Sequence, residues 1–254
     1  MRATSRDGTS IEYVAQGDGP PVVLVGGGLD DGTENVPLAA ALADTFTVYN
    51  YARRGRAGSG NTLPYAVDRE IEDLAALVDV AGERVGVLGV SSGAMFALEA
   101  AAAGVAIDRV AAYDVPYDTY PDAAARADDY RRDLADALSG GRRDEAVALF
   151  MRFAGAGDDD VTAARESPYW PGLVTLAPTL AHDAALYGPP PADRLATIRQ
   201  PALVVTGEAS GFFADAAAAV AELLPGASLR TLAGAGHVPA PEVIGPVLRE
   251  FFLP

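Results

Sequence analysis

A serine flanked by two glycines is the clearest chemical motif of the chain. The segment Gly89-Val-Ser91-Ser-Gly93 fits the pattern G-x-S-x-G. It lies between an apolar run at 84–88, typical of a strand, and an alanine-rich stretch at 92–103, typical of a helix. A serine on such a sharp turn projects its hydroxyl above the sheet, and small neighbours permit the close backbone approach. The pattern predicts that Ser91 is a nucleophile, against the alternative of a simple turn.

A nucleophilic serine needs a general base, and the chain has only 2 histidines, His182 and His237. His237 ends the segment Gly234-Ala-Gly-His237, after the last predicted strand, where a loop can bring the ring over the serine. His182 falls in a predicted helical insertion, and we interpret it as a partly exposed residue of that insertion rather than a catalytic one. We therefore expect His237 to be the base; the alternative is a surface histidine without a role.

Two carboxylates compete for the role of orienting the histidine. In the loop after the penultimate strand, the usual position of the acid holds Ser210, which cannot carry the required charge. Glu208 lies in the same loop, close to the strand end, whereas Asp114 ends the strand that follows the nucleophile helix. The order Ser, Asp, His along the chain favours Asp114. Glu208 stays open as the alternative acid. The alternative for Asp114 itself is that it is only a turn residue before Pro116.

A run of glycines at 26–28 follows the predicted strand at 22–25. Backbone N–H groups from such a loop, and from the residue after the nucleophile, can bind an oxyanion. We expect the N–H groups of Gly28 and Ser92 to form this oxyanion hole. A phosphate loop is the alternative, but the spacing fits neither G-x-G-x-x-G nor G-x-x-x-x-G-K-[ST].

The elements that position these residues alternate between strands and helices, the pattern of an α/β protein with a mostly parallel sheet and helices on both faces. Strands are predicted at 11–14, 22–25, 47–51, 84–88, 109–113, 202–206 and 228–232, and helices at 35–43, 67–80, 92–103, 214–224 and 241–252. Only helices are predicted between 117 and 196, at about 122–138, 143–153, 161–166 and 173–187. We therefore expect a core domain of residues 1–116 and 197–254, with residues 117–196 as a helical cap over the carboxyl ends of the strands.

Composition narrows the class of protein. The 254 residues fit one α/β unit with an insertion. No apolar run reaches the roughly 18 residues of a membrane span, and the first residues do not form a signal peptide, so we expect a soluble, cytoplasmic protein without a membrane partner. A net charge of −16 argues against nucleic acid as a partner. The absence of cysteine and the paucity of histidine give no basis for a metal site. We expect no cofactor, a small-molecule substrate, and a monomer or homodimer.

Together these motifs resemble the α/β-hydrolase superfamily over the whole chain. Within it, the pattern is most similar to small capped hydrolases that include the zearalenone lactone hydrolases. The matching segments are Ser91-Ser-Gly93, Asp114-Val-Pro116 and Ala209-Ser210. The resemblance implies an eight-stranded sheet, an acid at the end of the sixth strand, and a cap tryptophan at the substrate site. Trp170 is the only tryptophan, with packing inside the cap as its alternative role.

The chain departs from that family at several positions. The family has glutamate at the position of Asp114, aspartate at that of Ala52, and commonly histidine at that of Val90. We interpret the changes at Ala52 and Val90 as structural. The nearby basic cluster of Arg53, Arg54 and Arg56 is expected to pair with local carboxylates rather than to bind a ligand.

The predicted function is hydrolysis of an ester or lactone of a small, largely apolar substrate. Ser91 attacks the carbonyl, His237 moves the proton, and Asp114 orients His237. The pocket is expected to be walled by Leu29, Phe150, Tyr169, Trp170, Phe212 and Val238. Two alternatives stay open: a biosynthetic cyclisation or elimination with His237 and Asp114 as an acid–base pair, and a ligand-binding protein with little turnover.

Overall fold

A single eight-stranded sheet forms the centre of the protein, and the computed structural model describes it over residues 1–208 and 211–253. Ala209 and Ser210, matched to the family above, lie outside the described residues. The strands are β1 (Arg2–Thr4), β2 (Ser10–Gln16), β3 (Pro21–Val25), β4 (Thr47–Tyr51), β5 (Val85–Val90), β6 (Ile107–Tyr113), β7 (Ala202–Gly207) and β8 (Ser228–Leu232). Their order is β1-β2-β4-β3-β5-β6-β7-β8, parallel from β4 to β8, with β1 and β2 antiparallel at one edge. The predicted mostly parallel sheet is confirmed, and β1 is the strand that the sequence analysis missed.

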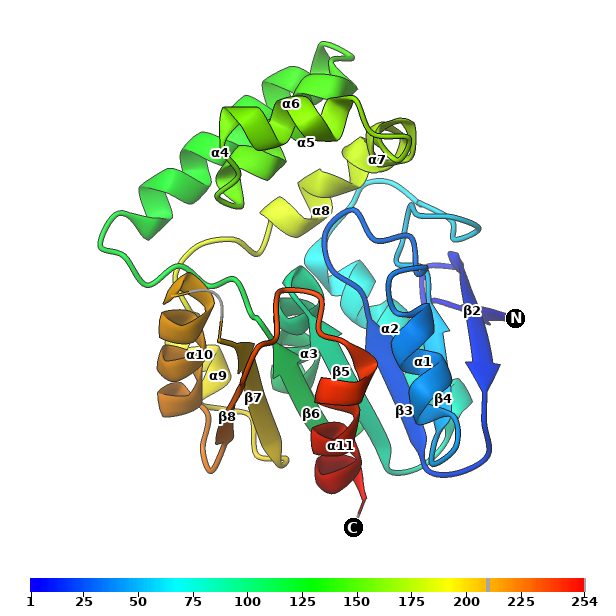
Figure 1. Cartoon of the computed structure of the whole chain (residues 1–254). Coiled ribbons are helices and arrows are strands. Elements are labelled where there is room, and N and C mark those ends of the chain that lie inside the picture. The colour runs from blue at the N-terminus through cyan, green and yellow to red at the C-terminus, as the bar shows by residue number, and fades with distance from the viewer. Residues whose placement is uncertain (209–210, 254) are drawn as a thin grey trace.

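Helices cover both faces of the sheet. Helices α1 (Val36–Leu42) and α11 (Pro241–Phe252) pack together on one face, in front of the sheet in Figure 1. Helices α2 (Val67–Ala81), α3 (Ser92–Ala102) and α10 (Gly211–Leu223) contribute to the apolar core on the other face. Every residue of β5 is buried, because helices cover the sheet on both faces. A parallel strand in this position needs a continuous apolar run, which is the pattern of this segment.

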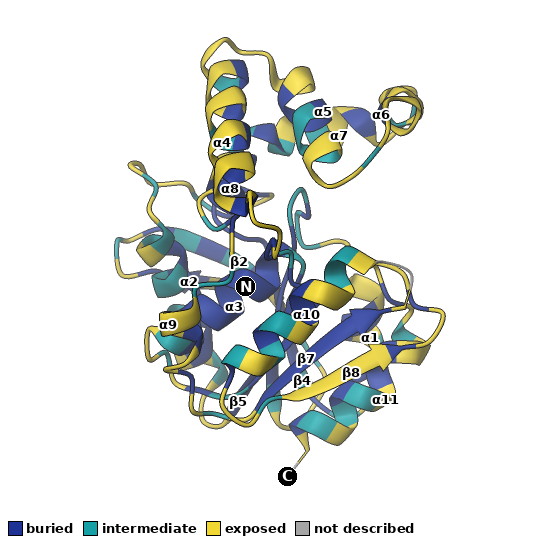
Figure 2. Cartoon of the chain, turned by 90° about the vertical axis from the view of Figure 1, so that its left-hand side faces the viewer, coloured by how far each residue is buried: buried dark blue, intermediate teal, exposed yellow. Residues whose placement is uncertain are grey.

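A group of helices between β6 and β7 lies above the carboxyl ends of the strands (Figure 1). These cap helices are α4 (Ala123–Ser139), α5 (Arg143–Phe153), α6 (Asp158–Arg165), α7 (Trp170–Leu176), the 3₁₀ turn η1 (Ala177–Thr179) and α8 (Leu180–Ala184). Figure 2 shows α4 with one buried stripe and an exposed outer surface, as helical periodicity requires. The stretch predicted as one helix at 173–187 is broken at Pro178, which has no N–H to donate. The short α9 (Ala192–Leu195) packs beside α3.

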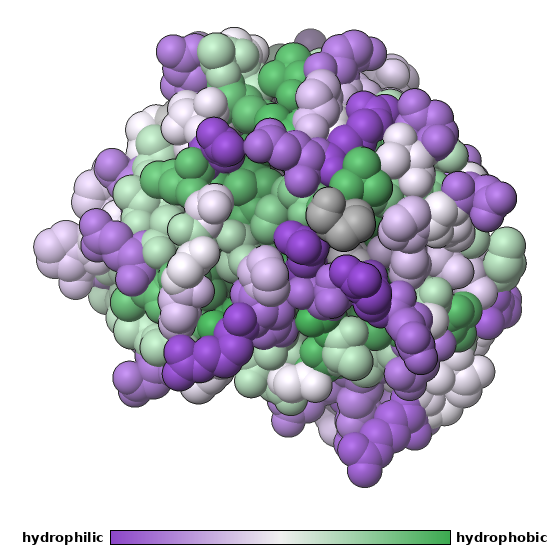
Figure 3. Space-filling view, turned by 90° about the horizontal axis from the view of Figure 1, so that it is seen from below, coloured by the Kyte–Doolittle hydropathy of each residue, from purple (hydrophilic) through white to green (hydrophobic). Residues whose placement is uncertain are grey.

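The surface opposite the cap carries hydrophilic groups interleaved with hydrophobic patches (Figure 3). At one edge of the sheet β8 is mostly exposed, and Figure 2 shows it in the exposed colour. In the described parts of the chain, no helix combines the length and the apolar character needed to cross a membrane.

Candidate active site

Ser91 lies on a strained turn between β5 and α3. Its φ of 55° and ψ of −128° are unfavourable for a residue with a side chain. The flanking glycines are required by packing: a Cβ on Gly93 would lie 2.2 Å from the carbonyl oxygen of Val25, and one on Gly89 would lie 2.3 Å from that of Gly93. The G-x-S-x-G pattern therefore encodes a tight strand-to-helix crossing that holds the Ser91 backbone in this conformation.

Asp114 and His237 meet although 123 residues separate them in sequence. Asp114 follows β6 with a φ of 45°, and its Oδ2 lies 3.1 Å from Nδ1 of His237. The other carboxylate oxygen accepts hydrogen bonds from Thr206 Oγ1 and from the Gly207 backbone N–H, both at 3.0 Å. The carboxylate is 2% exposed. Its orientation is therefore fixed by β7, the neighbouring strand.

The loop that carries His237 is anchored at two points. The Tyr113 hydroxyl donates to the Gly236 carbonyl at 2.5 Å, and the Gly234 N–H donates to a carboxylate oxygen of Glu208 at 3.0 Å. Glu208, the alternative acid, thus binds the loop backbone while Asp114 contacts the imidazole. This geometry favours Asp114 as the partner of His237.

A cavity of about 710 Å³ lies between the sheet and the cap, and Ser91 and His237 both line it. Within the described residues no hydrogen bond joins Ser91 Oγ to the His237 ring. Such bonds are commonly long in unliganded enzymes and shorten when substrate binds. The arrangement can therefore bring a base to a serine hydroxyl when a carbonyl compound occupies the cavity.

The wall of the cavity is largely apolar, with a few charged side chains. Phe150, Phe212 and Val238 line it, as expected. The charged lining residues are Glu34, Asp118, Arg126 and Arg152. Arg126 forms an ion pair with Asp118, and burial raises the pKa of Glu34 above its ordinary value. No group of three or more metal-ligating side chains is placed to hold a metal ion in the part of the chain that the structure describes.

Three residues expected in the wall do not line the cavity: Leu29, Tyr169 and Trp170. The Trp170 indole is buried inside the cap, where its Nε1 donates to Asp144 at 2.6 Å. Tyr169 is 78% exposed at the surface. For the two cap residues the expectation failed because α7 begins at Trp170 and packs on α5, so the indole is used in packing within the cap.

Sequence reasoning missed several aromatic wall residues, namely Phe153, Tyr187 and Phe213. The Phe213 ring stacks on His237, with centroids 4.6 Å apart and an interplanar angle of 12°. A signal for Phe153 was present, because it follows Phe150 by three positions and so shares its side of α5. Tyr187 follows α8, and no local pattern marks its direction.

The glycine run at 26–28 packs directly against the nucleophile and the cap. A Cβ on Gly27 would lie 2.9 Å from Ser91 Cβ, and one on Gly28 would lie 3.0 Å from the Phe150 ring. Asp30 closes the loop by accepting the N–H groups of Gly32 and Glu34 at 2.8 and 3.1 Å. At Gly27 no side chain would fit between this loop and Ser91, so the backbone itself passes beside the nucleophile.

The basic cluster of Arg53, Arg54 and Arg56 is fully buried and paired with carboxylates, and pairing with carboxylates of the core domain is confirmed for Arg53 and Arg54. One partner is not local: Asp183, from α8 of the cap, bridges Arg53 and Arg56 at 2.7 Å each. The expectation that His182 is partly exposed is wrong. Its ring is buried and stacks on Tyr65, with centroids 3.9 Å apart, because α8 descends into the core.

His182 makes the folded protein sensitive to acid. Burial lowers the pKa of His182 from 6.5 to about 4, so the folded protein holds the ring neutral. The unfolded chain takes up the proton below pH 6.5, so the stabilisation is complete above that pH and is lost as the pH falls towards 4. The free energy of unfolding should drop by about 2 kcal/mol from this group between pH 7.5 and pH 5.

His182→Phe preserves the stack on Tyr65 and removes the titration. Urea unfolding at both pH values should show a smaller acid-induced loss in the variant than in the wild type. Parallel losses in the two proteins would contradict the role assigned to His182.

Comparison with known proteins places this geometry in a family. Residues 22–243 match the model described as the alpha/beta hydrolase family. An alpha/beta hydrolase from Sphaerobacter thermophilus is 44% identical, with 100% of both chains covered and a TM-score of 0.93. A thermophilic esterase from Thermogutta terrifontis is 20% identical, with 100% of this chain and 99% of the esterase covered and a TM-score of 0.72. An enol-lactonase from Burkholderia xenovorans is 24% identical, with 94% of this chain and 93% of the lactonase covered and a TM-score of 0.61. Since the family model spans most of the chain, the protein belongs to the alpha/beta hydrolase family.

Proposed function

We propose that this hydrolase cleaves a carboxylic ester or lactone of a small, largely apolar substrate by acyl transfer to Ser91. The observation that carries the proposal is the 3.1 Å contact between Asp114 and His237 at the cavity that also holds Ser91. An imidazole oriented by a buried carboxylate, in the same cavity as a serine on a strained turn, is the arrangement that serine activation requires. The similar structures named esterase and enol-lactonase support the same reaction class.

In the proposed mechanism Ser91 Oγ attacks the carbonyl carbon, and its proton passes to Nε2 of His237. Asp114 accepts the N–H at Nδ1, which selects the tautomer that leaves Nε2 free to take this proton. The tetrahedral intermediate collapses when His237 protonates the departing alcohol oxygen. Water, deprotonated by the same imidazole, then attacks the acyl-enzyme and releases the acid and free Ser91.

The negative oxygen of the intermediate is assigned to the backbone N–H groups of Gly28 and Ser92. Ser92 is the first residue of α3, an 11-residue helix whose free N–H groups and dipole favour negative charge at this end. Gly28 lines the cavity from the opposite loop. Two donors on separate elements can then approach one oxygen from different directions, which is what an oxyanion hole requires.

Covalent labelling tests the proposal. The protein is incubated with a fluorophosphonate, and the adduct is located by intact mass and peptide mapping. We expect a single adduct on Ser91 and none in Ser91→Ala, because only a serine activated by a base reacts at a useful rate. An adduct would justify a screen of apolar esters and lactones.

Absence of an adduct in protein shown by circular dichroism to be folded would overturn the proposal. It would favour the two alternatives, acid–base chemistry by His237 and Asp114 or ligand binding with little turnover. Activity that survives Ser91→Ala would select the first of these.

A further inference from the structure

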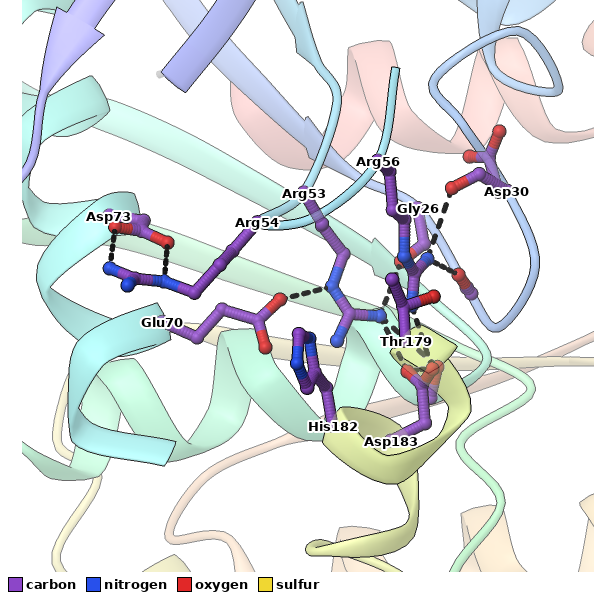
Figure 4. Close-up of polar contacts among 12 residues, drawn as sticks. Gly26, Asp30, Arg53, Arg54, Arg56, Glu70, Asp73, Thr179, His182 and Asp183 are labelled. Carbon is purple, nitrogen blue, oxygen red and sulfur yellow. Dashed lines mark hydrogen bonds and ion pairs between the residues drawn. The ribbon is translucent and has the colours of Figure 1, made fainter. Parts of the chain in front are cut away.

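Two buried arginines that do not line the cavity contact the backbone of the glycine run. Arg53 Nη1 donates to the Gly26 carbonyl at 3.2 Å. Arg56 Nη1 donates to the Gly27 carbonyl and, at 3.0 Å, to the Asp30 carbonyl. Figure 4 shows both guanidinium groups converging on this loop. The arginines therefore contact the backbone of the loop to which the oxyanion role is assigned.

The hydrogen bond to Gly27 bears on the N–H of Gly28, because both atoms belong to one peptide unit. This peptide is trans, so its carbonyl and its N–H point in opposite directions in a rigid plane. Arg56 at the carbonyl therefore fixes the direction of the N–H. A cationic donor on the carbonyl oxygen also polarises the peptide, which strengthens its N–H as a donor.

A carboxylate from the cap holds Arg56 in place. Asp183, on α8, accepts hydrogen bonds at 2.7 Å from Arg56, from Arg53 and from the Ser92 hydroxyl. Although burial opposes ionisation, the two arginines lower the pKa of Asp183 below its ordinary value, so it is a carboxylate. Asp183 thus contacts both halves of the assigned oxyanion hole. It binds the side chain of Ser92, whose N–H is one assigned donor, and it binds Arg56, which holds the peptide that carries the Gly28 N–H, the other assigned donor.

We propose that Arg56 is a positioning residue of the oxyanion hole, and that Asp183 couples this position to the docking of helix α8. The inference rests on the proposed acyl transfer at Ser91. Preorganised donors stabilise a transition state because they need no reorientation when charge develops. A glycine run has no side chains to fix its own peptide planes, so the arginine and the cap carboxylate supply that constraint.

Arg54 provides a matched comparison within the same cluster. It is as buried as Arg56, and it pairs with Asp73 at 2.7 and 2.9 Å and with Asp7 at 2.8 Å. Its other hydrogen-bond partners lie in the turn between β1 and β2, on α2 and on the loop before α2, and none belongs to the glycine run. If substitutions of Arg54 and Arg56 have the same effect on activity, the cause is the loss of a buried ion pair. If only the substitution of Arg56 lowers activity, the cause is its contact with the glycine run.

The test compares Arg56→Lys with Arg54→Lys, on an ester that the wild type hydrolyses and below both unfolding temperatures. A lysine keeps the charge but cannot make the several directed bonds of a guanidinium. For Arg56→Lys we expect kcat to fall about 10- to 100-fold with KM changed less than about threefold, since a lost oxyanion donor costs about 10²- to 10³-fold. Affinity for a trifluoromethyl ketone, which forms a tetrahedral adduct, should fall by the same factor as kcat/KM. Arg54→Lys should lower stability and leave kcat unchanged.

A second readout needs no substrate. In protein labelled with ¹⁵N-glycine, the Gly28 amide resonance should shift in Arg56→Lys and stay in place in Arg54→Lys. Arg56→Gln, whose amide can replace one donor without charge, serves as a further variant if the lysine variant does not fold. The inference would be overturned if Arg56→Lys left both the Gly28 resonance and kcat unchanged in a protein whose Ser91 is labelled by fluorophosphonate. Failure of wild-type Ser91 to be labelled would instead overturn the proposed function, and the oxyanion role with it.

Discussion

Asp114→Asn is expected to lower kcat by about 10⁴-fold without unfolding the protein. Asp114 Oδ1 accepts two hydrogen bonds from β7, and the amide oxygen of asparagine can keep both. The NH₂ group of asparagine then faces Nδ1 of His237 in place of Oδ2. Nδ1 must accept this hydrogen bond, so the imidazole proton moves to Nε2. A ring protonated at Nε2 cannot take the proton of Ser91.

The matched control is Glu208→Gln, which makes the same carboxylate-to-amide change in the other candidate acid. Glu208 accepts the Gly234 N–H through one oxygen, and the glutamine carbonyl can accept it as well. We expect its kcat to stay within about twofold of the wild type, as for a surface substitution. The measurements are kcat on an ester that the wild type hydrolyses and the rate of fluorophosphonate labelling. If Glu208→Gln alone loses activity, Asp114 is not the acid.

The Asp114–His237 contact could be predicted from sequence because it depends on the sheet. Apolar runs indicated the parallel strands, and the bounds predicted at 47–51 and 228–232 agree with β4 and β8. Carboxyl ends of neighbouring parallel strands share one edge, so a residue after β6 and a loop after β8 can meet there. The three-residue β1 was missed because it is too short to show an alternating pattern.

The contacts between cap and core could not be predicted in the same way. Arg56 and Asp183 are 127 residues apart, and their meeting depends on how α8 enters the core, which no local periodicity specifies. Three arginines in a run of four residues are typical of a solvated surface, and here they are buried because carboxylates from α2 and α8 neutralise them. Trp170 shows the same limit. Its position in the cap was predicted, but the direction of its ring was not.

Asp183→Asn is expected to destabilise the protein by about 3–5 kcal/mol, because it leaves buried arginines without their shared counterion. Arg53 keeps Glu70 at 2.5 Å, whereas Arg56 is left with backbone carbonyls. The unfolding temperature should fall by about 10 °C, given the size of the chain. Urea unfolding measures the free energy, and hydrogen exchange should show the loss of protection concentrated in α8.

Asp158→Asn is the control for this substitution, since it breaks a cap ion pair of similar length at the surface. Asp158 lies 2.9 Å from Arg152, but its side chain is 82% exposed, so water and salt screen the pair. Its loss should cost at most about 1 kcal/mol, and less in 0.5 M NaCl, whereas the cost of Asp183→Asn should persist in salt. Equal, salt-sensitive losses in the two variants would mean that water reaches Asp183. The cap would then be open in solution, and the buried cluster could not hold α8 against the glycine run.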